Sequence, residues 1–332
     1  MVCGGKAVAT QLEFEHPIIE LQSKIQELRQ FMQESGMNLN DEVDKLERRL
    51  LELKSSVYST LTPWQRVQVA RQPGRPTTLD YIQGLCSEFI ELHGDRNFRD
   101  DPAIVGGIGL MDGEPVTVIG TQKGRDTKEN IHRNFGMAHP EGYRKALRLM
   151  KQAEQYHRPV VLFIDTAGAY PGMSAEERGQ SEAIARNLRE MAGLKTPTIS
   201  VVAGEGGSGG ALGLGVTDRI FVLEYAWYSV IAPESAAAIM WKDSGQAARA
   251  AETMRISALD LLELGVADGI IKEPEGGAQK APAQTIQSVK HQVVSSLAEL
   301  KQLSIAELLQ ARYDKYRDMG VYFERSVDKV ST

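Results

Sequence analysis

A glycine-rich stretch at residues 204–210, Gly-Glu-Gly-Gly-Ser-Gly-Gly, constrains this chain more than any other part of its sequence. Five of these seven residues are glycines, which have no side chains to pack into a core. Glycine permits positive φ angles and lets another group come close to bare backbone N–H groups. The stretch therefore indicates an anion or oxyanion site built from backbone, or else a tight strand-to-helix turn packed against a neighbour.

The sequence on either side sets this stretch between a strand and a helix. The apolar, β-branched run 198–203 is typical of a buried strand, and the run 211–216 predicts a helix. A second glycine turn at 166–172 follows the apolar strand 160–165 and precedes a helix predicted over 175–194. Ligand sites in α/β proteins lie at the carboxyl ends of parallel strands. We therefore expect both turns at one edge of a sheet, where converging N–H groups would form an oxyanion hole.

The N-terminal residues predict a helical hairpin. Apolar residues spaced by three and four predict helices over 18–32 and 43–57, with Asn40 or Asp41 as the cap of the second helix. Each apolar seam is too short for a free coiled coil, so we expect an antiparallel hairpin that lies on the main domain or on a partner. Prolines between 63 and 76 then predict an extended linker.

The rest of the chain predicts a mixed α/β domain followed by two helices. Asp112-Gly113, between the apolar runs 104–110 and 115–120, is a strong β-hairpin signal. Further strands are predicted at 219–223 and 228–232, and further helices at 79–92, 140–156, 234–241, 285–300 and 305–319. We divide the chain into a helical hairpin (11–60), an α/β domain (75–278) and C-terminal helices (283–321).

Composition narrows the classes of function. A net charge of −6 argues against nucleic-acid binding, and no apolar run approaches the roughly 18 residues of a membrane-spanning helix. The two cysteines, Cys3 and Cys86, are too few for a disulfide framework and suit a reducing cytosol. Residues 1–6 lack the features of a signal peptide, so a cytoplasmic location is predicted. No cluster of ligand residues has metal spacing, so we expect no metal in this chain.

Side chains for catalysis are hard to find in the sequence. Gly206 to Gly210 fit the G-x-S-x-G pattern of a serine nucleophile, but that pattern arises readily in a glycine-rich loop. None of the six histidines is marked as its base, so a structural or hydrogen-bonding role for Ser208 is the simpler interpretation. The loop is not a P-loop, because no Lys-Ser/Thr follows the glycines. Residues 123–151 hold eight basic and three acidic residues, which indicates either a phosphate-attracting surface or a solvated helix face or subunit interface.

Several long motifs, in the same order along the chain, resemble the α subunit of the bacterial and plastid acetyl-CoA carboxylase carboxyltransferase. The resemblance runs from about Gln11 to Gly320. The first ten residues match nothing in this family. The motifs that carry the resemblance are residues 134–148, 165–172, 176–185 and 204–210.

The resemblance implies a crotonase-like (ClpP/crotonase) α/β fold with an N-terminal helical extension and C-terminal helices. The family moves a carboxyl group from carboxybiotin, carried on the biotin carboxyl carrier protein, to acetyl-CoA, and the product malonyl-CoA enters fatty acid synthesis. Biotin carboxylase and a β subunit with a zinc ribbon are the implied partners, in an α2β2 enzyme that is active only with both subunits. This chain has no such ribbon, as expected for α.

The resemblance also implies the site residues. The N–H groups of Gly206 and Gly207 would hold the ureido oxygen of biotin as it becomes anionic, and the matching loop of the β subunit would hold the acetyl-CoA enolate. Gly168, Ala169, Gly209 and Gly210 would line the substrate pocket. This chain has alanine at position 167, where the family usually has proline. The change from proline to alanine removes no backbone N–H donor. This chemistry needs no side-chain nucleophile, and Gly206→Val or Gly207→Val is expected to abolish it while leaving the fold intact.

Three other functions remain open at this point. A stand-alone crotonase-like hydratase or isomerase would need positioned carboxylates, for which only Asp165 and Glu205 are close in sequence. A non-catalytic scaffold would use the terminal helices for assembly and leave the glycine turns unexplained. A serine hydrolase would need Ser208 as its nucleophile.

Overall fold

The computed structural model describes residues 12–320, and the sequence features at residues 1–10, Cys3 among them, lie outside that range. Its centre is one mixed sheet with the strand order β1-β2-β3-β4-β5-β6-β8, and β7 pairs with the end of β5. The first three strands are antiparallel, and the strands from β3 onwards are parallel. The strands are β1 (Glu88–Glu91), β2 (Ile104–Met111), β3 (Glu114–Thr121), β4 (Val160–Thr166), β5 (Thr198–Gly207), β6 (Arg219–Leu223), β7 (Trp227–Ser229) and β8 (Gly269–Ile271).

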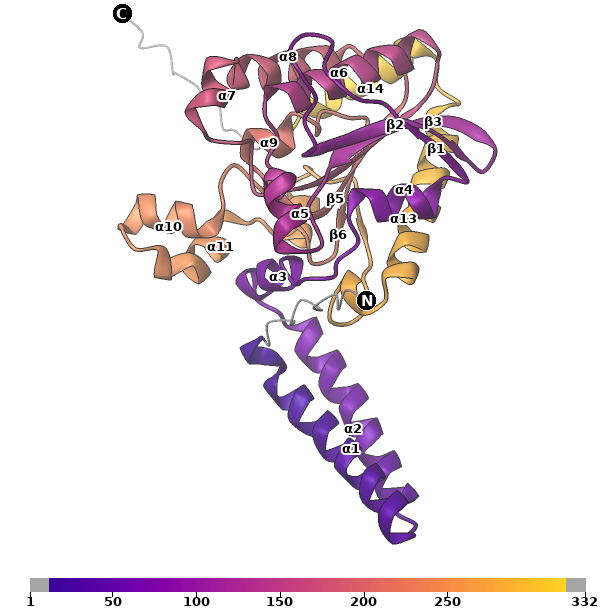
Figure 1. The fold of residues 1–332 in the computed structure, drawn as a ribbon, viewed down its shortest axis with the longest axis vertical. Coiled ribbons are helices and arrows are strands. Elements are labelled where there is room, and N and C mark those ends of the chain that lie inside the picture. Colours follow the sequence, from indigo (N-terminus) through magenta and orange to yellow (C-terminus); the bar gives the residue numbers. More distant parts are fainter. Residues whose placement is uncertain (1–11, 321–332) are drawn as a thin grey trace, which may run out of the picture.

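Helices cover both faces of this sheet, as expected for parallel crossovers (Figure 1). One face carries α6 (Pro140–Gln155) and α8 (Gln180–Ala192), and the other carries α4 (Thr78–Leu85) and α13 (Pro282–Leu300). The remaining helices of the body are α3 (Pro63–Ala70), α5 (Thr127–His132), α7 (Met173–Glu177), α9 (Ser208–Leu212), α10 (Pro233–Trp241), α11 (Ala247–Met254), α12 (Ala258–Glu263) and α14 (Ile305–Arg317).

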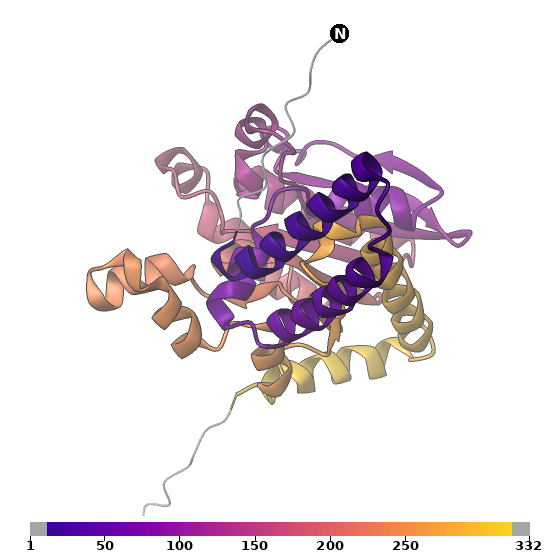
Figure 2. The ribbon, with the colours of Figure 1, turned by 90° about the horizontal axis from the view of Figure 1, so that it is seen from below.

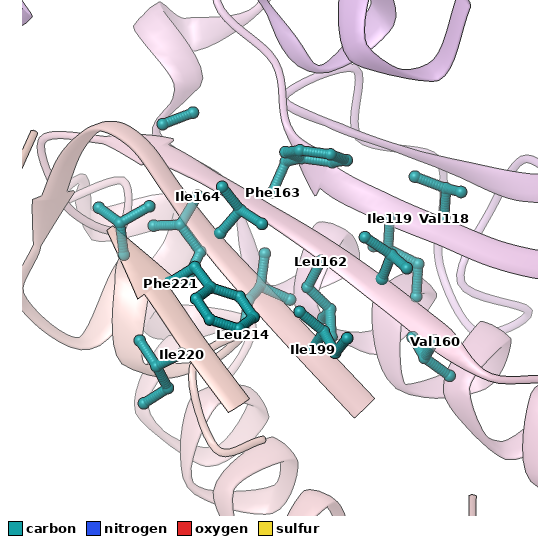
Figure 3. Close-up of a cluster of buried hydrophobic side chains, with 14 of the residues drawn as sticks. Val118, Ile119, Val160, Leu162, Phe163, Ile164, Ile199, Leu214, Ile220 and Phe221 are labelled. Atoms are coloured by element: carbon teal, nitrogen blue, oxygen red, sulfur yellow. The ribbon is translucent and has the colours of Figure 1, made fainter. Parts of the chain in front are cut away.

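The main core lies between the sheet and these helices. Val160 to Ile164 of β4 are buried without interruption, which is the pattern of a parallel strand covered on both faces. Figure 3 shows this cluster, in which side chains of β3, β4, β5 and β6 meet, with Phe163 and Phe221 among them. The apolar runs that predicted strands in the sequence thus form the centre of the molecule.

The helical hairpin is present, but it does not lie on the main domain. Helices α1 (His16–Ser35) and α2 (Asn40–Ser59) pack against each other (Figure 2) and project away from the body (Figure 1). They contact the body at their base, where Ile18 and Tyr58 join a small cluster with Tyr225. The predicted caps of α2 are wrong: the side chain of Asn38 accepts the N–H of Asn40 at 3.1 Å, and neither Asn40 nor Asp41 is the N-cap.

Two predictions near the start of the α/β domain are wrong. Residues 63–70 are not an extended linker but helix α3, because Thr62 and Gln65 form a reciprocal capping box and Pro63 occupies the first turn, where proline is tolerated. The helix predicted over 79–92 ends at Leu85. Residues 88–91 instead form strand β1, which pairs with β2 opposite Gly107 and Gly109. A side chain at Gly107 would lie 2.0 Å from the carbonyl oxygen of Ile90, so glycine admits this edge strand.

Other boundaries also differ from the predictions. The helix expected over 175–194 is divided into α7 and α8 by Gly179, whose φ is +84°. The strand expected over 228–232 is short and ends at Ser229. Four further short elements, α5, α11, α12 and β8, were not predicted from the sequence. The hairpin at Asp112-Gly113 is confirmed, and both residues have the positive φ of a tight turn. The division into three parts stays a prediction.

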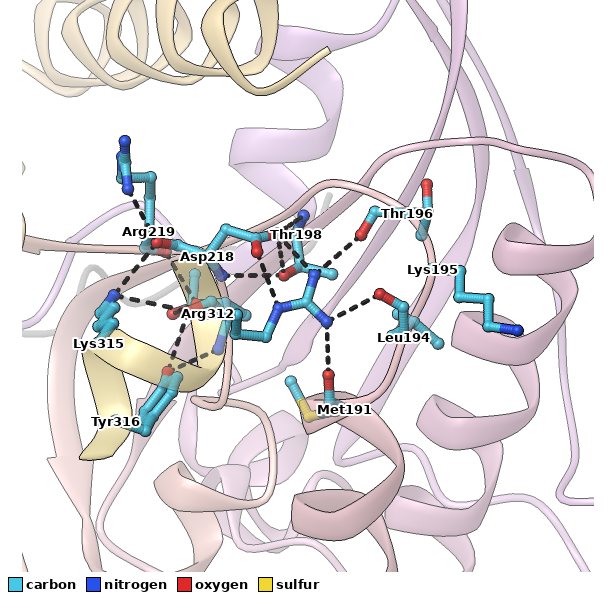
Figure 4. A network of polar contacts seen from close by, with 12 residues as sticks. Met191, Leu194, Lys195, Thr196, Thr198, Asp218, Arg219, Arg312, Lys315 and Tyr316 are labelled. Carbon is cyan, nitrogen blue, oxygen red and sulfur yellow. Dashed lines mark hydrogen bonds and ion pairs between the residues drawn. The ribbon is translucent and has the colours of Figure 1, made fainter. Parts of the chain in front are cut away.

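The C-terminal helix α14 is attached to the amino edge of the sheet, the edge at which the parallel strands begin. Arg312 is 1% exposed and forms two bonds of 2.8 Å with Asp218. Its remaining N–H groups donate to the carbonyl oxygens of Met191, Leu194 and Thr196 (Figure 4). Asp218 also accepts the N–H and hydroxyl of Thr198. This network fixes α14 where β5 and β6 start.

Candidate functional site

The two glycine turns meet at the carboxyl edge of the sheet, as predicted. Strands β4 and β5 are parallel neighbours, with Thr166 paired to Gly206. A Cβ atom at Gly207 would lie 2.0 Å from the carbonyl oxygen of Ala167, and one at Gly210 would lie 2.3 Å from the carbonyl carbon of Gly168. The two turns are therefore in direct backbone contact, which only glycine at 207 and 210 allows.

Gly206 and Gly207 are needed for close packing within the protein, in addition to any role in binding a ligand. The strand β5 continues through Gly206 and Gly207, which are buried, so the loop expected from 204 begins only after Gly207. Ser208 then takes a positive φ of 54° and opens α9 three residues earlier than predicted. The Cα atoms of Gly206 and Gly207 face the protein itself. A valine at 207 would collide with the backbone of Ala167, contrary to the expectation that such a variant keeps its fold.

The backbone donors around the turns are in three situations. Gly206 and Gly207 lie within the ladder that β5 forms with β4 and β7. The N–H of Gly168 donates to the hydroxyl of Thr166 at 3.2 Å. The N–H groups of Gly209 and Gly210 belong to the first turn of α9, where no partner exists within the helix. Gly209 is partly exposed, and so is Ala169 in the other turn. The accessible backbone of the site thus centres on the start of α9.

Two carboxylates stand directly behind the turns, at the ends of the same strands. Lys123 Nζ lies 2.8 Å from Asp165 Oδ1 and 2.8 Å from Glu205 Oε1. The N–H of Glu205 also donates to Asp165 Oδ1 at 2.8 Å, which joins β4 to β5 just before Gly206. Burial would raise the pKa of Glu205, but the charges of Lys123 and Arg71 outweigh it and lower that pKa to about 2. Glu205 is therefore ionised and held, which makes it unsuited to donate a proton.

A polar pocket of about 580 Å³ opens beside these carboxylates, between α3, α5 and the sheet edge. Arg71 and Arg75 line it together with Lys123. Arg75 is buried and pairs with Glu273 at 2.7 and 3.0 Å, while its Nη2 donates to the carbonyl oxygen of Ala203 at 2.7 Å. The cations of the pocket are thus already paired with carboxylates of the same chain.

The first glycine turn is fixed from its other side. The N–H of Tyr170 donates to the carbonyl oxygen of Ala138 at 3.0 Å, and the ring of Tyr170 packs against the ring of His139 at a tilt of 36°, with centroids 4.2 Å apart. The buried amide of Gln180 donates to the carbonyl oxygens of Ala138 and Tyr170 at 2.8 and 3.0 Å. Burial and the nearby charge of Arg178 lower the pKa of His139. The turn is thereby attached to the start of α6.

Ser208 has the position of a nucleophile without the partners of one. It lies on a sharp strand-to-helix turn and is exposed, as the G-x-S-x-G pattern requires. Among the described residues, however, the hydrogen bonds of histidine rings go to Asp100 and Arg178, and none reaches Ser208. A serine nucleophile needs such a base, so this geometry does not support the hydrolase alternative.

The basic stretch 123–151 is mostly neutralised within the chain. Arg144 pairs with Asp95 at 2.8 Å and with Glu141 at 3.0 Å. Lys145, which is almost fully buried, pairs with Asp100 at 2.6 Å. Burial would raise the pKa of Asp100, but Lys145 and the N–H of Gly94 outweigh it and lower that pKa to about 2. The excess of positive charge in the sequence therefore reflects ion pairs with distant acidic residues rather than an open phosphate-binding surface.

Lys123, Arg71 and Gln180 hold the site, and none of them was predicted from the sequence. Lys123 is 82 residues from Glu205, and Arg71 is 134 residues away, so no local pattern connects them. Of the residues in this network, only Glu205 is marked in the sequence, because it is the single acidic residue within the glycine-rich stretch. Within residues 12–320, no group of His, Cys, Asp and Glu side chains is arranged to hold a metal ion. None of the helices in that range combines the length and apolar character needed to cross a membrane.

Comparison with solved structures defines the fold. The chain resembles one chain of a Pseudomonas malonate decarboxylase hetero-tetramer in complex with coenzyme A, with a TM-score of 0.56, 18% identity and coverage of 71% of this chain and 92% of that one. It also resembles the β subunit of P. aeruginosa geranyl-CoA carboxylase, with a TM-score of 0.54, 16% identity and coverage of 79% and 48%. The class is therefore a crotonase-like α/β protein with a helical N-terminal extension and C-terminal helices.

Comparison of sequences defines the family. A family model described as acetyl co-enzyme A carboxylase carboxyltransferase-like matches residues 11–320. The chain is 60% identical, over 95% of its length and 97% of the relative, to the acetyl-coenzyme A carboxylase carboxyl transferase subunit alpha of Halalkalibacterium halodurans. It is 59% identical, over 94% and 100%, to the subunit alpha of Staphylococcus epidermidis. The chain belongs to the acetyl-CoA carboxylase carboxyltransferase family.

Proposed function

We propose that this chain is the α subunit of an acetyl-CoA carboxylase carboxyltransferase. With a β subunit it transfers the carboxyl group of carboxybiotin to acetyl-CoA, and the malonyl-CoA formed supplies fatty acid synthesis. One observation in the structure carries the proposal: two glycine turns are in backbone contact at the carboxyl edge of the sheet, and the carboxylates behind them are already held by cations. Such a site stabilises charge with backbone dipoles and offers no side-chain nucleophile.

In this mechanism the backbone of the second turn binds and orients the biotin ring. Carboxybiotin supplies the activated carboxyl group. We infer that the ureido oxygen binds where β5 ends and α9 begins. The N–H groups of Gly206 and Gly207, the last two residues of β5, donate to it as its negative charge develops, beside the N–H groups of Gly209 and Gly210, which have no partner within α9. Gly168 and Ala169 line the same pocket. The partly exposed Gly209 and Ala169 supply the open backbone that such a ligand needs. A preorganised donor of this kind contributes about 3–4 kcal/mol of transition-state stabilisation.

The β subunit completes the site in this proposal. We infer that its own glycine turn holds the acetyl-CoA enolate, that a zinc ribbon belongs to it, and that the assembly is α2β2. Biotin carboxylase and the biotin carboxyl carrier protein are the further partners, since they charge and deliver the carboxybiotin. The reaction takes place in the cytoplasm, as the two cysteines predict.

A hydratase or isomerase that acts without a partner is the less favoured alternative. Such an enzyme would use Asp165 or Glu205 as its acid or base. Both carboxylates bind Lys123 Nζ at 2.8 Å, and the pKa of Glu205 is lowered to about 2. A carboxylate with that pKa is a poor base near neutral pH and carries no proton to donate.

The decisive experiment measures malonyl-CoA formation from a carboxybiotin donor and acetyl-CoA. The full chain is assayed alone and then with a zinc-ribbon β subunit, and Ser208→Ala is assayed beside it. We expect activity only with the partner, and turnover of Ser208→Ala within about twofold of the wild type, because the serine hydroxyl has no base. Activity of the chain alone on an enoyl-CoA, or complete loss of activity in Ser208→Ala, would contradict the proposal.

A further inference from the structure

Arg71 connects three parts of the chain that are distant in sequence. It follows helix α3, and its Nε donates to Glu205 Oε2 at 2.8 Å. The other two nitrogens of its guanidinium bind the carboxylate of Glu234, which lies in the first turn of α10. The guanidinium also stands about 6 Å from the ring centroids of Trp64 and Trp227. Its side chain is 30% exposed, so these partners fix it without full burial.

Glu205 is the residue through which Arg71 reaches the site. It immediately precedes Gly206 and Gly207, and its side chain is only 10% exposed. Arg71 binds one oxygen of its carboxylate, and Lys123 binds the other at 2.8 Å. The backbone of Glu205 is fixed as well, because its N–H donates to Asp165. Loss of Arg71 would leave a buried carboxylate with half of its partners, which is a costly state.

Glu234 lies at the root of a pair of helices, α10 and α11, that protrudes from the body (Figure 1). The root is connected to the glycine turn by two routes. Strand β7 pairs with Glu205, Gly206 and Gly207, and the chain then runs directly into α10. The second route is the Arg71 bridge from Glu234 to Glu205. The position of the backbone donors therefore depends on how the root of α10 is held.

We propose that Arg71 is a positioning residue for the carboxyl transfer reaction, which sets the end of β5 relative to the root of α10. Arg71 does not touch the reacting atoms. It acts through Glu205, whose displacement would shift the N–H groups of Gly206 and Gly207. A guanidinium is suited to this task, because two of its nitrogens bind both oxygens of Glu234 while the third binds Glu205, and the single nitrogen of a lysine cannot reproduce that two-nitrogen contact. The inference rests on the proposed function for its kinetic effect, but not for its structural effect.

The test compares Arg71→Met with a matched control, Arg255→Met. Arg255 also binds two carboxylates, Asp260 and Glu263, and is 41% exposed, but neither of these ion pairs involves β5 or α10. We expect Arg71→Met to lower kcat on the order of 10- to 100-fold in the complex with the β subunit, with KM for acetyl-CoA changed less than about threefold. Arg71→Lys should recover part of this loss, and Arg255→Met should match the wild type.

A second measurement does not depend on activity. The amide NMR signals of Gly206 and Gly207 in the full chain should move in Arg71→Met and in Glu234→Gln, and stay in place in Arg255→Met. Unchanged kcat in Arg71→Met, or unmoved Gly206 and Gly207 signals, would overturn the inference. If Arg71→Met does not fold, Arg71→Lys and Glu234→Gln decide by the same two criteria. If the wild-type complex forms no malonyl-CoA, the proposed function fails, and the NMR signals alone decide the role of Arg71.

Discussion

Each of the two edges of the central sheet has a network of arginine–carboxylate bonds, but the two networks have different roles. At the amino edge, Arg312 is 1% exposed, and its N–H groups donate to Asp218 and to three carbonyl oxygens (Figure 4). At the carboxyl edge, Arg71 is 30% exposed and divides its donors between Glu205 and Glu234, which belong to different elements. Both are arginine–carboxylate networks, yet the first closes the fold and the second borders the candidate site.

The difference lies in burial and in what each carboxylate is attached to. Asp218 immediately precedes β6 and is buried together with its partner, so that pair is released only by unfolding. Glu205 leads directly into the glycine turn, and its partner Arg71 also holds the root of a protruding helix pair. The network of Arg71 therefore borders the backbone of the candidate site, whereas that of Arg312 fixes a helix to the sheet. Three predictions test this contrast, from the largest effect to the smallest.

The largest expected effect is at the amino edge. Arg312→Met should lower the free energy of unfolding by about 3–5 kcal/mol, because it leaves Asp218 buried without a counter-charge. Denaturant unfolding of the full chain measures this loss. The control is Arg317→Met, at the end of the same helix, which removes exposed pairs with Asp314 and Asp318 and should change stability by less than about 0.5 kcal/mol. Equal effects of the two variants would remove the contrast between the edges.

The second prediction concerns the contact between the two turns. Gly207→Ala places a Cβ atom 2.0 Å from the carbonyl oxygen of Ala167, so the turns must separate. We expect a loss of roughly 1–3 kcal/mol in stability and about 100-fold in carboxyl transfer. Gly193→Ala is the control, since a Cβ atom there meets nothing within 4 Å. Wild-type turnover in Gly207→Ala would show that the site tolerates separated turns.

The third prediction is the pH dependence of the carboxyl edge. The pKa of Glu205 is lowered from 4.5 to about 2 in the folded state, so Glu205 contributes stability above about pH 4.5 and loses it as the pH falls towards 2. The difference in unfolding free energy between the wild type and Glu205→Gln should therefore be largest at neutral pH and shrink below pH 4.5. Urea unfolding between pH 3 and 7 measures it. If the difference in unfolding free energy grows as the pH falls, the pKa of Glu205 is raised by folding and not lowered.

Local sequence patterns correctly predicted the elements that are marked by an apolar run, by helical spacing of apolar residues or by a turn dipeptide. The buried strands 160–165 and 198–203, the turn at Asp112-Gly113 and the terminal helices appear where their patterns indicate. The helix predicted over 79–92 failed after Leu85, because pairing with β2 through Gly107 overrides the local pattern. The capping box of α3 was present in the sequence at Thr62 and Gln65, but the neighbouring prolines led to the prediction of an extended linker instead.

The site divides in the same way. Glycine turns after two apolar strands are visible in the sequence, and their meeting at one sheet edge follows from parallel pairing. The reason for the glycine at 207 is not visible, because the backbone of Ala167 that excludes a side chain comes from another turn. The same holds for Arg71 and Lys123, whose partner Glu205 is far along the chain.

The sequence by itself determined the α/β class, the two glycine turns and the family of this protein, because periodicity, glycine placement and long motifs are local properties. Only the tertiary structure decided that the basic stretch is mostly neutralised within the chain, that the helical hairpin projects from the body, and that Glu205 is held between Lys123 and Arg71. Those outcomes depend on contacts between residues tens to hundreds of positions apart. Such contacts form only when folding brings the elements together, and their energies are set by the burial that results.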